Sequence, residues 1–414
     1  MKNGSKQLWL GLSLLNLSIV ALYGFLLRSK ILFSLPAIDY RNLLSAHSHF
    51  AFGGWVGLAL LVLLVYNLLP ETLSQKKFYQ WMLLGVELSS LGMAVFFPFV
   101  GYNGVSIFFS SLYIVMNYVF ASVFIKDVVK SVEDKTVRLL AVTAIAALLL
   151  SAIGPLGLVY ILFSNSTDSI LYRDSIYTFL HFQYNGFFTL AVFALFFQFL
   201  RSEKIVLHKS SQRFAVFLCL SIVPALFLSL LWHGKVLHYG LAAVGAVFIL
   251  LALVQFVPIF LRLKKEALFR DPLARTFWTF SFLSFLLKMM LNVGTLIPSL
   301  GRAVFGDRPV IIGFLHLVFL GFVTFFILSY LIEEGFFSTT QKNIRLPFFI
   351  FAFGIIANEV LLALQGLGIL FQTNSGLYTW LLWMASMFLL AGAAAIAGSF
   401  WINKKAASRA WQAS

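Results

Sequence analysis

The 414-residue chain contains few charged residues and a single cysteine. Only 11% of its residues are charged and 61% are hydrophobic, and its mean hydropathy is +0.94. Soluble globular chains carry about 25% charged and about 45 to 50% apolar residues. This composition therefore excludes a protein that folds in water, and it indicates an integral membrane protein in contact with lipid.

The shortage of cysteine and of acidic residues excludes several kinds of site. Because Cys219 is alone, the chain has no internal disulfide, no cysteine-rich metal centre and no CxxCH attachment for a c-type haem. Any metal must be held by histidine or carboxylate. The 15 acidic residues face 30 basic ones, which gives a net charge of +15. These basic residues lie in short loops between apolar runs rather than on one face, so we expect no nucleic-acid partner.

Twelve apolar runs are long enough to span a bilayer, since a spanning helix needs about 20 residues. The sequence predicts an all-α polytopic bundle, because in lipid a helix satisfies its own backbone hydrogen bonds. The first run lacks a small-residue cleavage site and is predicted to be a retained span rather than a signal peptide. The expected spans are 8–27, 44–69, 78–100, 104–125, 139–163, 175–200, 214–232, 238–261, 276–295, 309–332, 346–370 and 377–402.

The distribution of Lys and Arg predicts the orientation of the bundle. The segments on the side of both termini hold 22 of these 30 residues and the alternate loops hold 7, while Lys288 lies within a span. The positive-inside rule therefore predicts that both termini are cytoplasmic. We expect a multi-pass protein of a bacterial-type inner (plasma) membrane. No linker or soluble segment interrupts the pattern, so residues 1–414 are expected to form a single transmembrane domain in contact with membrane lipid.

A histidine motif recurs three times along the chain. His49, His181 and His316 each begin the pattern H-x-x-x-x-G-aromatic, at intervals of 132 and 135 residues and near the start of spans 2, 6 and 10. An arginine stands eight residues before each of them, at Arg41, Arg173 and Arg308. This self-similarity predicts a pseudo-three-fold repeat of four helices, with units of about 1–135, 136–270 and 271–414.

Six of the seven histidines are predicted to lie on the outer side of the membrane. The three motif histidines share one depth with His47, and the loop between spans 7 and 8 adds His233 and His238. His208 lies among basic residues on the cytoplasmic side and is excluded. Polar groups within a membrane usually mark a function, and neutral imidazole is a common ligand of haem iron and copper. The other interpretation is that these histidines only bond neighbouring helices.

The histidine pattern resembles subunit I of the haem-copper oxidase superfamily, taken with nitric oxide reductases and NnrS-type haem-copper membrane proteins. The run Ala46-His-Ser-His-Phe-Ala-Phe-Gly-Gly-Trp-Val-Gly57 is similar to the H-x-H-x-x-x-x-G-W-V-G run of cbb3-type oxidases. The segment from His181 to Gly186 is similar to the metal-binding run of nitric oxide reductases, and Leu237-His-Tyr239 looks like part of the copper-binding loop.

The resemblance implies a role for each histidine. His47 and His49 would be haem ligands, and His316 the opposing axial ligand of a low-spin haem. His181, His233 and His238 would bind copper. The implied cofactors are one or two b-type haems and copper, with Tyr184 and Asn185 near the copper as catalytic candidates. Arg41, Arg173 and Arg308 would hold haem propionates through charge-assisted bonds, or else contact lipid headgroups.

The sequence departs from the family at several positions. The H-x-H pair is on span 2 instead of span 10, and Phe50 stands where NnrS-type proteins have Glu. The two copper-loop histidines are five residues apart instead of adjacent. Asn185 occupies the position where oxidases often have Tyr and reductases Glu. A proton-pumping oxidase is therefore the less favoured member.

The function implied is redox chemistry with, or binding of, a diatomic gas, either nitric oxide or dioxygen. Whether the protein is an enzyme, of the nitric oxide reductase or terminal oxidase type, stays open. An enzyme would need a separate electron donor, because the chain has no CxxCH and no soluble domain. The alternative is a secondary transporter without haem, since transporters also use repeats and buried charges, although their repeats are often inverted.

Three ionisable residues are predicted to lie deep within spans. Glu87, Lys288 and Glu359 fall in spans 3, 9 and 11. A charge at the bilayer centre costs about 2.5 to 3.5 kcal/mol on the insertion scale, so such residues should be paired, neutral or near water. They suggest a proton route to the haem site, or else a structural Lys–Glu pair.

Overall fold

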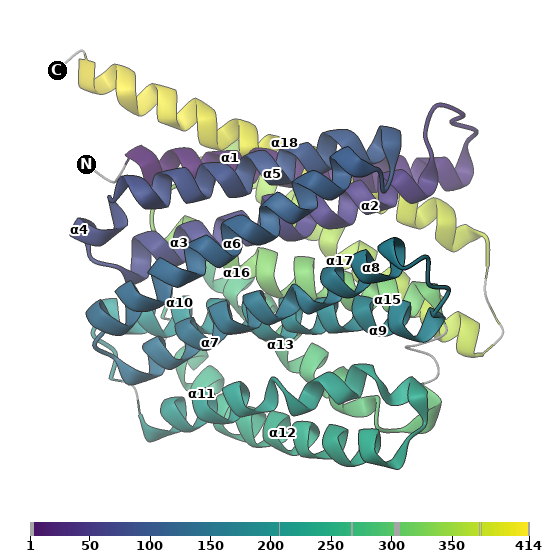
Figure 1. The fold of residues 1–414 in the computed structure, drawn as a ribbon. Helices are drawn as coiled ribbons and strands as arrows, with labels where there is room; N and C mark the ends of the chain where they lie inside the picture. The colour runs from purple at the N-terminus through teal and green to yellow at the C-terminus, as the bar shows by residue number, and fades with distance from the viewer. Residues whose placement is uncertain are drawn as a thin grey trace.

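The computed structural model describes residues 4–206, 208–265, 268–301, 307–371, 373 and 375–412, without the side chains of 369, 370 and 403–412. The described residues form helices and no strand, which confirms the all-α prediction (Figure 1). The α-helices are α1 (Gly4–Leu32), α2 (Tyr40–Phe50), α3 (Leu58–Leu68), α4 (Glu71–Ser74), α5 (Lys77–Val100), α6 (Gly104–Ser131), α7 (Lys135–Ser151), α8 (Ile153–Phe163), α9 (Ser169–Leu180), α10 (Thr189–Ser202), α11 (Lys209–Ser221), α12 (Val236–Lys265), α13 (Pro272–Gly294), α15 (Arg308–His316), α16 (Phe325–Glu333), α17 (Lys342–Leu370) and α18 (Leu377–Gln412).

Five shorter segments have other helical geometries. Three are π-helical: η1 (Ala51–Gly57), η2 (His181–Phe188) and η5 (Leu317–Thr324). Each joins two α-helices end to end, so that α2–η1–α3, α9–η2–α10 and α15–η5–α16 are continuous long helices. The other two are 3₁₀-helical: η3 (Pro224–Ser229) and η4 (Leu231–His233).

Eleven of the helices in the described part of the chain are long and apolar enough to cross a membrane. They correspond to eleven of the twelve predicted spans. The seventh predicted span, 214–232, is not one continuous helix: α11 ends at Ser221, and η3 begins at Pro224. Proline has no backbone N–H and its ring clashes with the preceding turn, which breaks an α-helix.

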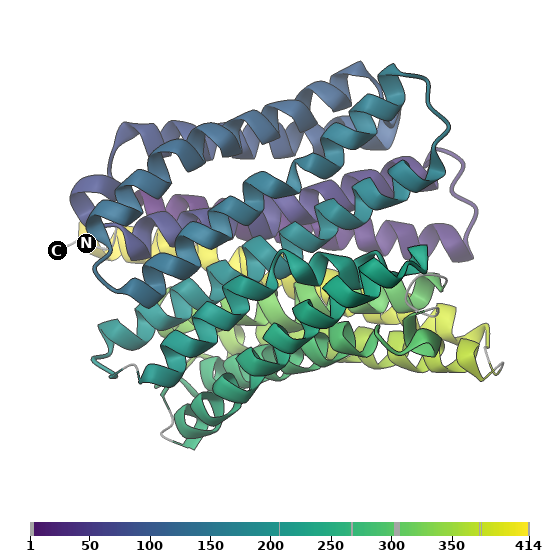
Figure 2. The same cartoon turned by 60° about the horizontal axis from the view of Figure 1, so that its bottom comes forward.

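The long helices run roughly parallel and pack around an inner group (Figures 1 and 2). Most of α2–η1–α3 and of α9–η2–α10 is buried inside the bundle. α3 packs on α10, and η5 contacts both η1 and η2, so the three helices that carry π-helical segments meet in the interior. The first and last helices, α1 and α18, lie side by side and close the outer layer. The motif histidines are therefore on the central helices.

Acidic caps fix where several of the helices begin. The side chains of Asp39, Asp134, Asp168 and Asp271 accept hydrogen bonds from backbone N–H groups in the first turns of α2, α7, α9 and α13. Such caps satisfy N–H groups that have no partner within the helix. Four of the 15 acidic residues thus cap helices.

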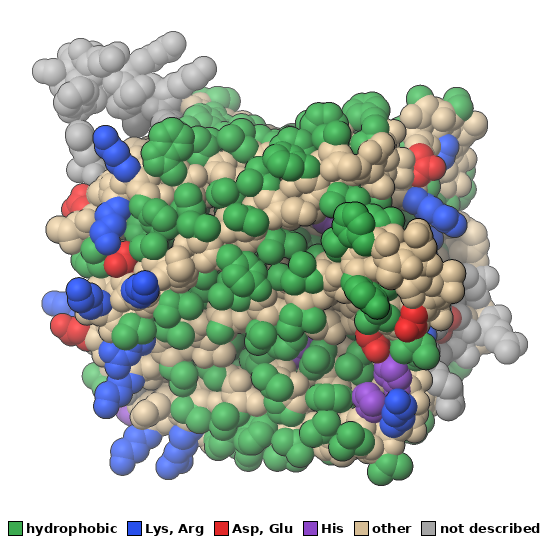
Figure 3. Space-filling model, viewed as in Figure 1, with side chains coloured by type: hydrophobic (Ala, Val, Ile, Leu, Met, Phe, Trp, Pro, Cys, Tyr) green, Lys and Arg blue, Asp and Glu red, His purple; other side chains and the backbone are tan. Residues whose placement is uncertain are grey.

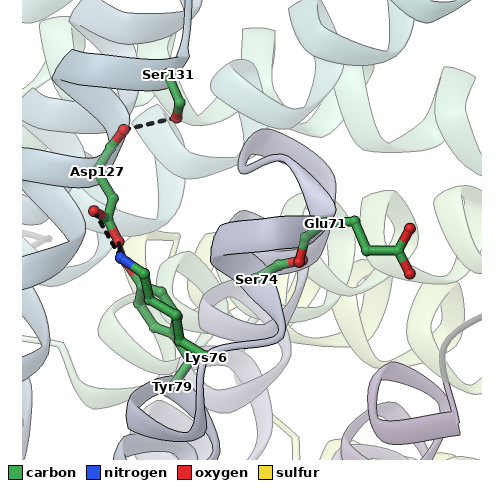
Figure 4. A network of polar contacts seen from close by, with 6 residues as sticks. All are labelled: Glu71, Ser74, Lys76, Tyr79, Asp127 and Ser131. Carbon is green, nitrogen blue, oxygen red and sulfur yellow. Dashed lines mark hydrogen bonds and ion pairs between the residues drawn. The ribbon is translucent and has the colours of Figure 1, made fainter.

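The end of the bundle that carries both termini is rich in Lys and Arg (Figure 3). At this end Asp127 of α6 accepts hydrogen bonds from Lys76 Nζ at 3.0 Å and from the Tyr79 hydroxyl at 2.7 Å (Figure 4). This cluster ties the start of α5 to α6. The gathering of basic residues beside the termini is the pattern on which the predicted orientation depends.

Candidate functional site

Each of the three histidine motifs coincides with a π-helical segment. η1 begins two residues after His49, η2 begins at His181, and η5 begins one residue after His316. The glycine and the aromatic residue of each motif lie inside the segment. A π-helical turn is wider than an α-helical turn and is rare, and it occurs frequently at functional sites. The sequence motif therefore corresponds to an unusual backbone feature at all three positions.

Polar side chains from neighbouring helices bond to a carbonyl in each π-helical segment. The Gly54 carbonyl accepts from Asn16 Nδ2 at 2.8 Å, and the Phe322 carbonyl accepts from Ser281 Oγ at 2.7 Å. The Tyr184 carbonyl accepts from Lys288 Nζ at 3.3 Å. Widening a helical turn disturbs the regular backbone bonds, and a buried carbonyl without a donor is costly. These side chains satisfy the disturbed backbone.

The motif glycines lie where a side chain would collide with a neighbour. A Cβ atom at Gly186 would lie 2.5 Å from the Ala147 Cβ of α7, and one at Gly321 would lie 2.8 Å from the Ser284 hydroxyl of α13. At Gly54 the same atom would lie 2.3 Å from the Phe50 ring. The glycine of the motif therefore allows each π-helical segment to pack closely against what surrounds it.

Three phenylalanines, one from each π-helical segment, meet at the centre of the bundle. The ring centroids of Phe52 and Phe319 are 4.5 Å apart, those of Phe188 and Phe319 are 5.3 Å apart, and those of Phe52 and Phe188 are 5.7 Å apart. These are favourable distances for aromatic pairs. This Phe52–Phe188–Phe319 cluster packs the three central helices against one another, within the segments that follow the motif histidines.

A cavity of about 520 Å³ brings together histidines from two of the three central helices. His47 of α2 and His316 of α15 both line it, and its other walls come from α1, α17 and α18. Gly24 of α1 also lines the cavity, and a Cβ there would lie only 3.3 Å from His47 Cε1. The glycine leaves space for the imidazole. We call this the histidine cavity.

Both histidines of this cavity are held in the form that metals bind. His47 Nδ1 lies 3.0 Å from the Val20 carbonyl, and His316 Nδ1 lies 2.8 Å from the Ile312 carbonyl. Because a carbonyl only accepts, the hydrogen is on Nδ1 and Nε2 keeps its lone pair. Such a bond to a backbone carbonyl is typical of metal-ligating histidine, and it fixes the tautomer and the orientation of the ring. Each of the two residues could therefore bind a metal such as haem iron through Nε2.

Two arginines give the histidine cavity a positive wall. Arg308 lines it and donates to the Tyr40 hydroxyl at 2.9 Å, and Arg28 of α1 also lines it. Arg41 is exposed and is not among the lining residues. Arg173 lies over the Trp232 ring at 4.6 Å. Of the three predicted arginines, only Arg308 thus reaches the candidate haem site.

His49 is not part of the histidine cavity. Its Nδ1 bonds to the Ser45 carbonyl at 2.9 Å, and its ring stacks on Phe97 of α5 with centroids 4.7 Å apart. Residues two apart on a helix point about 200° away from each other. The residue of the H-x-H pair that shares a cavity with His316 is therefore His47, and the structure does not bring His49 and His316 to one cavity.

His181 uses both ring nitrogens within the protein. Its Nε2 donates to the Ile222 carbonyl at 2.7 Å, and its Nδ1 accepts from Asn185 Nδ2 at 3.2 Å. Asn185 in turn accepts from Asn292 Nδ2 at 3.1 Å. The Ile222 carbonyl lies two residues before Pro224, just beyond the end of α11 at Ser221. His181 therefore donates a hydrogen bond to a carbonyl at the break in this helix. As placed, this imidazole has no free lone pair for copper.

His233 and His238 lie near one another but away from His181. His233 Nε2 pairs with the Asp174 carboxylate at 3.0 Å, and the rings of His233 and His238 stack with centroids 4.8 Å apart and an angle of 17°. Asp174 is seven residues before His181 on one helix, or roughly 10 Å along its axis. In the described part of the chain no three His, Cys, Asp or Glu residues are grouped to hold a metal ion. The predicted copper ligands therefore do not fit a copper site as placed.

The three ionisable residues within the spans form no ion pair with one another. Glu87 accepts from Asn16 Nδ2 at 2.8 Å, and Glu359 accepts from Asn358 Nδ2 at 3.1 Å. Lys288 is fully buried and donates to Thr189 Oγ1 at 2.7 Å in addition to the Tyr184 carbonyl. The predicted structural pair of Lys288 with Glu87 or Glu359 is thus not formed, and the proton route stays a prediction.

The unusual burial of Lys288 gives a testable expectation for stability. An ammonium within a bilayer costs about 2.5 to 3.5 kcal/mol on the insertion scale. Lys288→Met keeps most of the volume without the charge, so we expect the thermal midpoint in detergent to stay the same or to rise. Lys288→Ala should lower it, because it leaves a cavity worth about 2 to 5 kcal/mol. A clear loss with Met would show that the bonds from Lys288 to the Tyr184 carbonyl and to Thr189 outweigh the cost of its burial.

The structure also places residues at these sites that the sequence did not single out. Arg28 lies one residue beyond the end of the first predicted span, 8–27, and lines the histidine cavity. Asn16 bridges Glu87 and the Gly54 carbonyl, and Asn292 continues the chain of bonds from His181. The available signal was their polarity within apolar runs, which is the same signal that had selected Glu87, Lys288 and Glu359.

No family model matches the chain, and no curated protein matches it.

Proposed function

We propose that the protein is a haem-binding membrane redox protein of the haem-copper oxidase type, in which His47 and His316 hold a low-spin b-type haem. The observation that carries this proposal is the histidine cavity. Two imidazoles from different central helices line one space, and each has Nδ1 bonded to a backbone carbonyl so that Nε2 is available. Structural helix-packing histidines would not need to share a cavity.

The charges and the shape of this cavity support the same proposal. Arg28 and Arg308 would pair with anionic haem propionates, because guanidinium groups bind carboxylates through two parallel hydrogen bonds. Gly24 keeps the space beside His47 open. Leu27, Leu44 and Ile312 give the cavity an apolar lining that would exclude water.

We further propose that the bundle is a pseudo-three-fold repeat of four-helix units with twelve membrane passages. The repeat is supported by three features that recur at the motifs. Each motif has a π-helical segment, a carbonyl in that segment that accepts a hydrogen bond from a neighbouring side chain, and a glycine in a crowded position. The α11–η3 segment would be the seventh passage, broken at Pro224. The basic end of the bundle, which carries both termini, would face the cytoplasm of a bacterial-type cell.

The residues of the histidine cavity suit electron transfer rather than gas binding. A haem in this cavity would supply a one-electron redox couple. His47 and His316 would hold this haem, and Arg28 and Arg308 would bind its propionates. Binding or reduction of nitric oxide or dioxygen needs a second centre, and that part of the proposal rests on the resemblance alone. Copper, Tyr184 and Asn185 have no role in this proposal, because both ring nitrogens of His181 are hydrogen-bonded within the protein.

A visible spectrum of the purified protein, with iron and copper analysis, tests the proposal. We expect a Soret band, a sharp α-band after reduction with dithionite and about one iron per chain. Absence of both the Soret band and iron would contradict haem binding and favour the secondary transporter without haem. The proposal would also fail if iron were present without a low-spin reduced spectrum.

A further inference from the structure

A second cavity, of about 330 Å³, lies beside the histidine cavity. Its walls come from α9, η2, η3, α13, α15 and α17. Thr295, which directly follows α13, and Pro309, the second residue of α15, both line it. The cavity therefore lies near the end of the bundle opposite to the two termini (Figure 1).

The second cavity opens toward the lipid. Three of its lining leucines are largely exposed on the outside of the bundle: Leu287 at 52%, Leu291 at 44% and Leu367 at 49%. They belong to α13 and α17, which are candidate membrane spans. A molecule that enters between these helices would come from the membrane and not from bulk water.

The lining of this cavity holds acid but no base. Among the described residues, Glu359 is the one carboxylic side chain that lines it, and no Lys, Arg or His does. Arg308 lines the histidine cavity instead, and the Lys288 ammonium donates to Thr189 and to the Tyr184 carbonyl. Any formal charge on the cavity wall is therefore negative.

The Glu359 carboxylate lacks a cationic partner within the described part of the chain. Its Oε1 accepts from the Asn358 amide at 3.1 Å, and no partner of Oε2 occurs among the described residues. A carboxylate held away from water needs an opposite charge or further donors to offset the loss of hydration. Because the surrounding helices supply no cation, the occupant of the cavity is the group that can.

The remaining polar groups and the aromatic rings of the wall also suit a positive charge. Tyr184 and Phe314 line the cavity with ring centroids 5.7 Å apart, and the faces of such rings attract cations. The hydroxyl groups of Ser229 and Thr295 present oxygen lone pairs, as does Asn292 Oδ1, since the Asn292 amide nitrogen is used on Asn185.

We propose that the second cavity binds a hydrophobic organic cation, whose charged head pairs with Glu359 and whose apolar body packs against Phe314 and the lining leucines. A lipid acyl chain would leave the carboxylate unpaired, and an anion would be repelled by it. The volume is at the lower end of the range for small-molecule sites, about 300 to 1,000 Å³, so a compact cation with one ring fits best. This role of Glu359 differs from the predicted proton route, and it requires no haem.

Equilibrium dialysis of tritiated benzyltrimethylammonium against the full chain in a nonionic detergent tests this site. The probe has one aromatic ring, and as a quaternary ion it does not coordinate haem iron. We expect saturable binding of one ion per chain. Glu359→Gln keeps the size of the side chain without its charge and should weaken binding at least tenfold, or by at least about 1.4 kcal/mol. Phe314→Leu should weaken it about threefold, because it removes one ring face.

Glu87→Gln is the matched control. Glu87 also lies within a span and accepts from an asparagine amide, that of Asn16, but it does not line the cavity. Its substitution should leave the affinity unchanged. A second control is neopentylbenzene, in which carbon replaces the ammonium nitrogen. It has the shape of the probe without the charge, so it should compete at least tenfold more weakly for the wild-type protein.

The outcomes separate this site from the haem proposal. Absence of saturable binding would overturn the cation site, and so would equal affinity in wild type and Glu359→Gln. Equal competition by neopentylbenzene would overturn it even if Glu359→Gln failed to fold. A protein with a Soret band that does not bind the cation would contradict this site alone. Saturable, charge-dependent binding by a protein without haem would support the site and contradict the proposed function.

Discussion

Replacing His316 by alanine should abolish the low-spin haem spectrum, and so should replacing His47. Replacing His49 should preserve it. The first two residues line the same cavity, and each has Nδ1 bonded to a carbonyl so that Nε2 is available, so either substitution would remove one of the two residues proposed to hold the haem. His49 stacks on Phe97 outside this cavity. We expect the Soret absorbance per chain to fall at least tenfold in His47→Ala and His316→Ala.

His49→Ala is a close control because it lies on the same helix, two residues away, and its Nδ1 also bonds to a backbone carbonyl. The spectra should be recorded at matched amounts of folded monomer, which gel filtration provides. Addition of imidazole should partly restore the spectrum of His47→Ala, since the empty position can bind the free ligand. Loss of the haem in His49→Ala with retention in His47→Ala would show that the other member of the pair is the ligand.

The contrast between His47 and His49 shows what the sequence could and could not predict. The H-x-H pair and its place near the outer end of span 2 were recognisable from the residues alone. Their roles depend on which side of α2 faces α1 and α15. That rotation is set by packing, through Gly24 on one side and Phe97 on the other. The sequence pattern alone does not determine this rotation of α2.

The spans themselves were largely predictable because hydropathy follows directly from the need to bury apolar residues in lipid. The exception is informative. Pro224 stands in the middle of an apolar run that otherwise satisfies the length criterion, and it ends α11. The local rule for proline was available, and it outweighs hydropathy at this position.

The state of His181 required the structure. The sequence aligns this residue with His49 and His316, but its imidazole bonds to the Ile222 carbonyl and to Asn185. The carbonyl is released by the break before Pro224, on a helix far away in the sequence. Equivalent positions in a repeat can therefore have different chemistry, because each faces a different neighbour.

Replacing the glycine of the second histidine motif should have a large effect on stability. Gly186→Ala should destabilise the protein by about 1 to 3 kcal/mol, since a Cβ at this position would lie 2.5 Å from Ala147 Cβ. Neither atom is the end of a flexible side chain, so η2 or α7 must move. Because Gly186 follows Asn185 directly, the movement should also disturb the bonds that link Asn292, Asn185 and His181.

Gly240→Ala is the matched control, because Gly240 also lies in a helix but has no atom within 4 Å of its Cβ position. There the better helix propensity of alanine should raise stability by up to about 1 kcal/mol. The two variants therefore carry the same chemical change with opposite expected signs, measured as the shift of the thermal midpoint in detergent. Gly321→Ala should fall between them, because the Ser284 hydroxyl 2.8 Å away can rotate. If Gly186→Ala were as stable as Gly240→Ala, the close packing of η2 on α7 would not be what requires glycine in the motif.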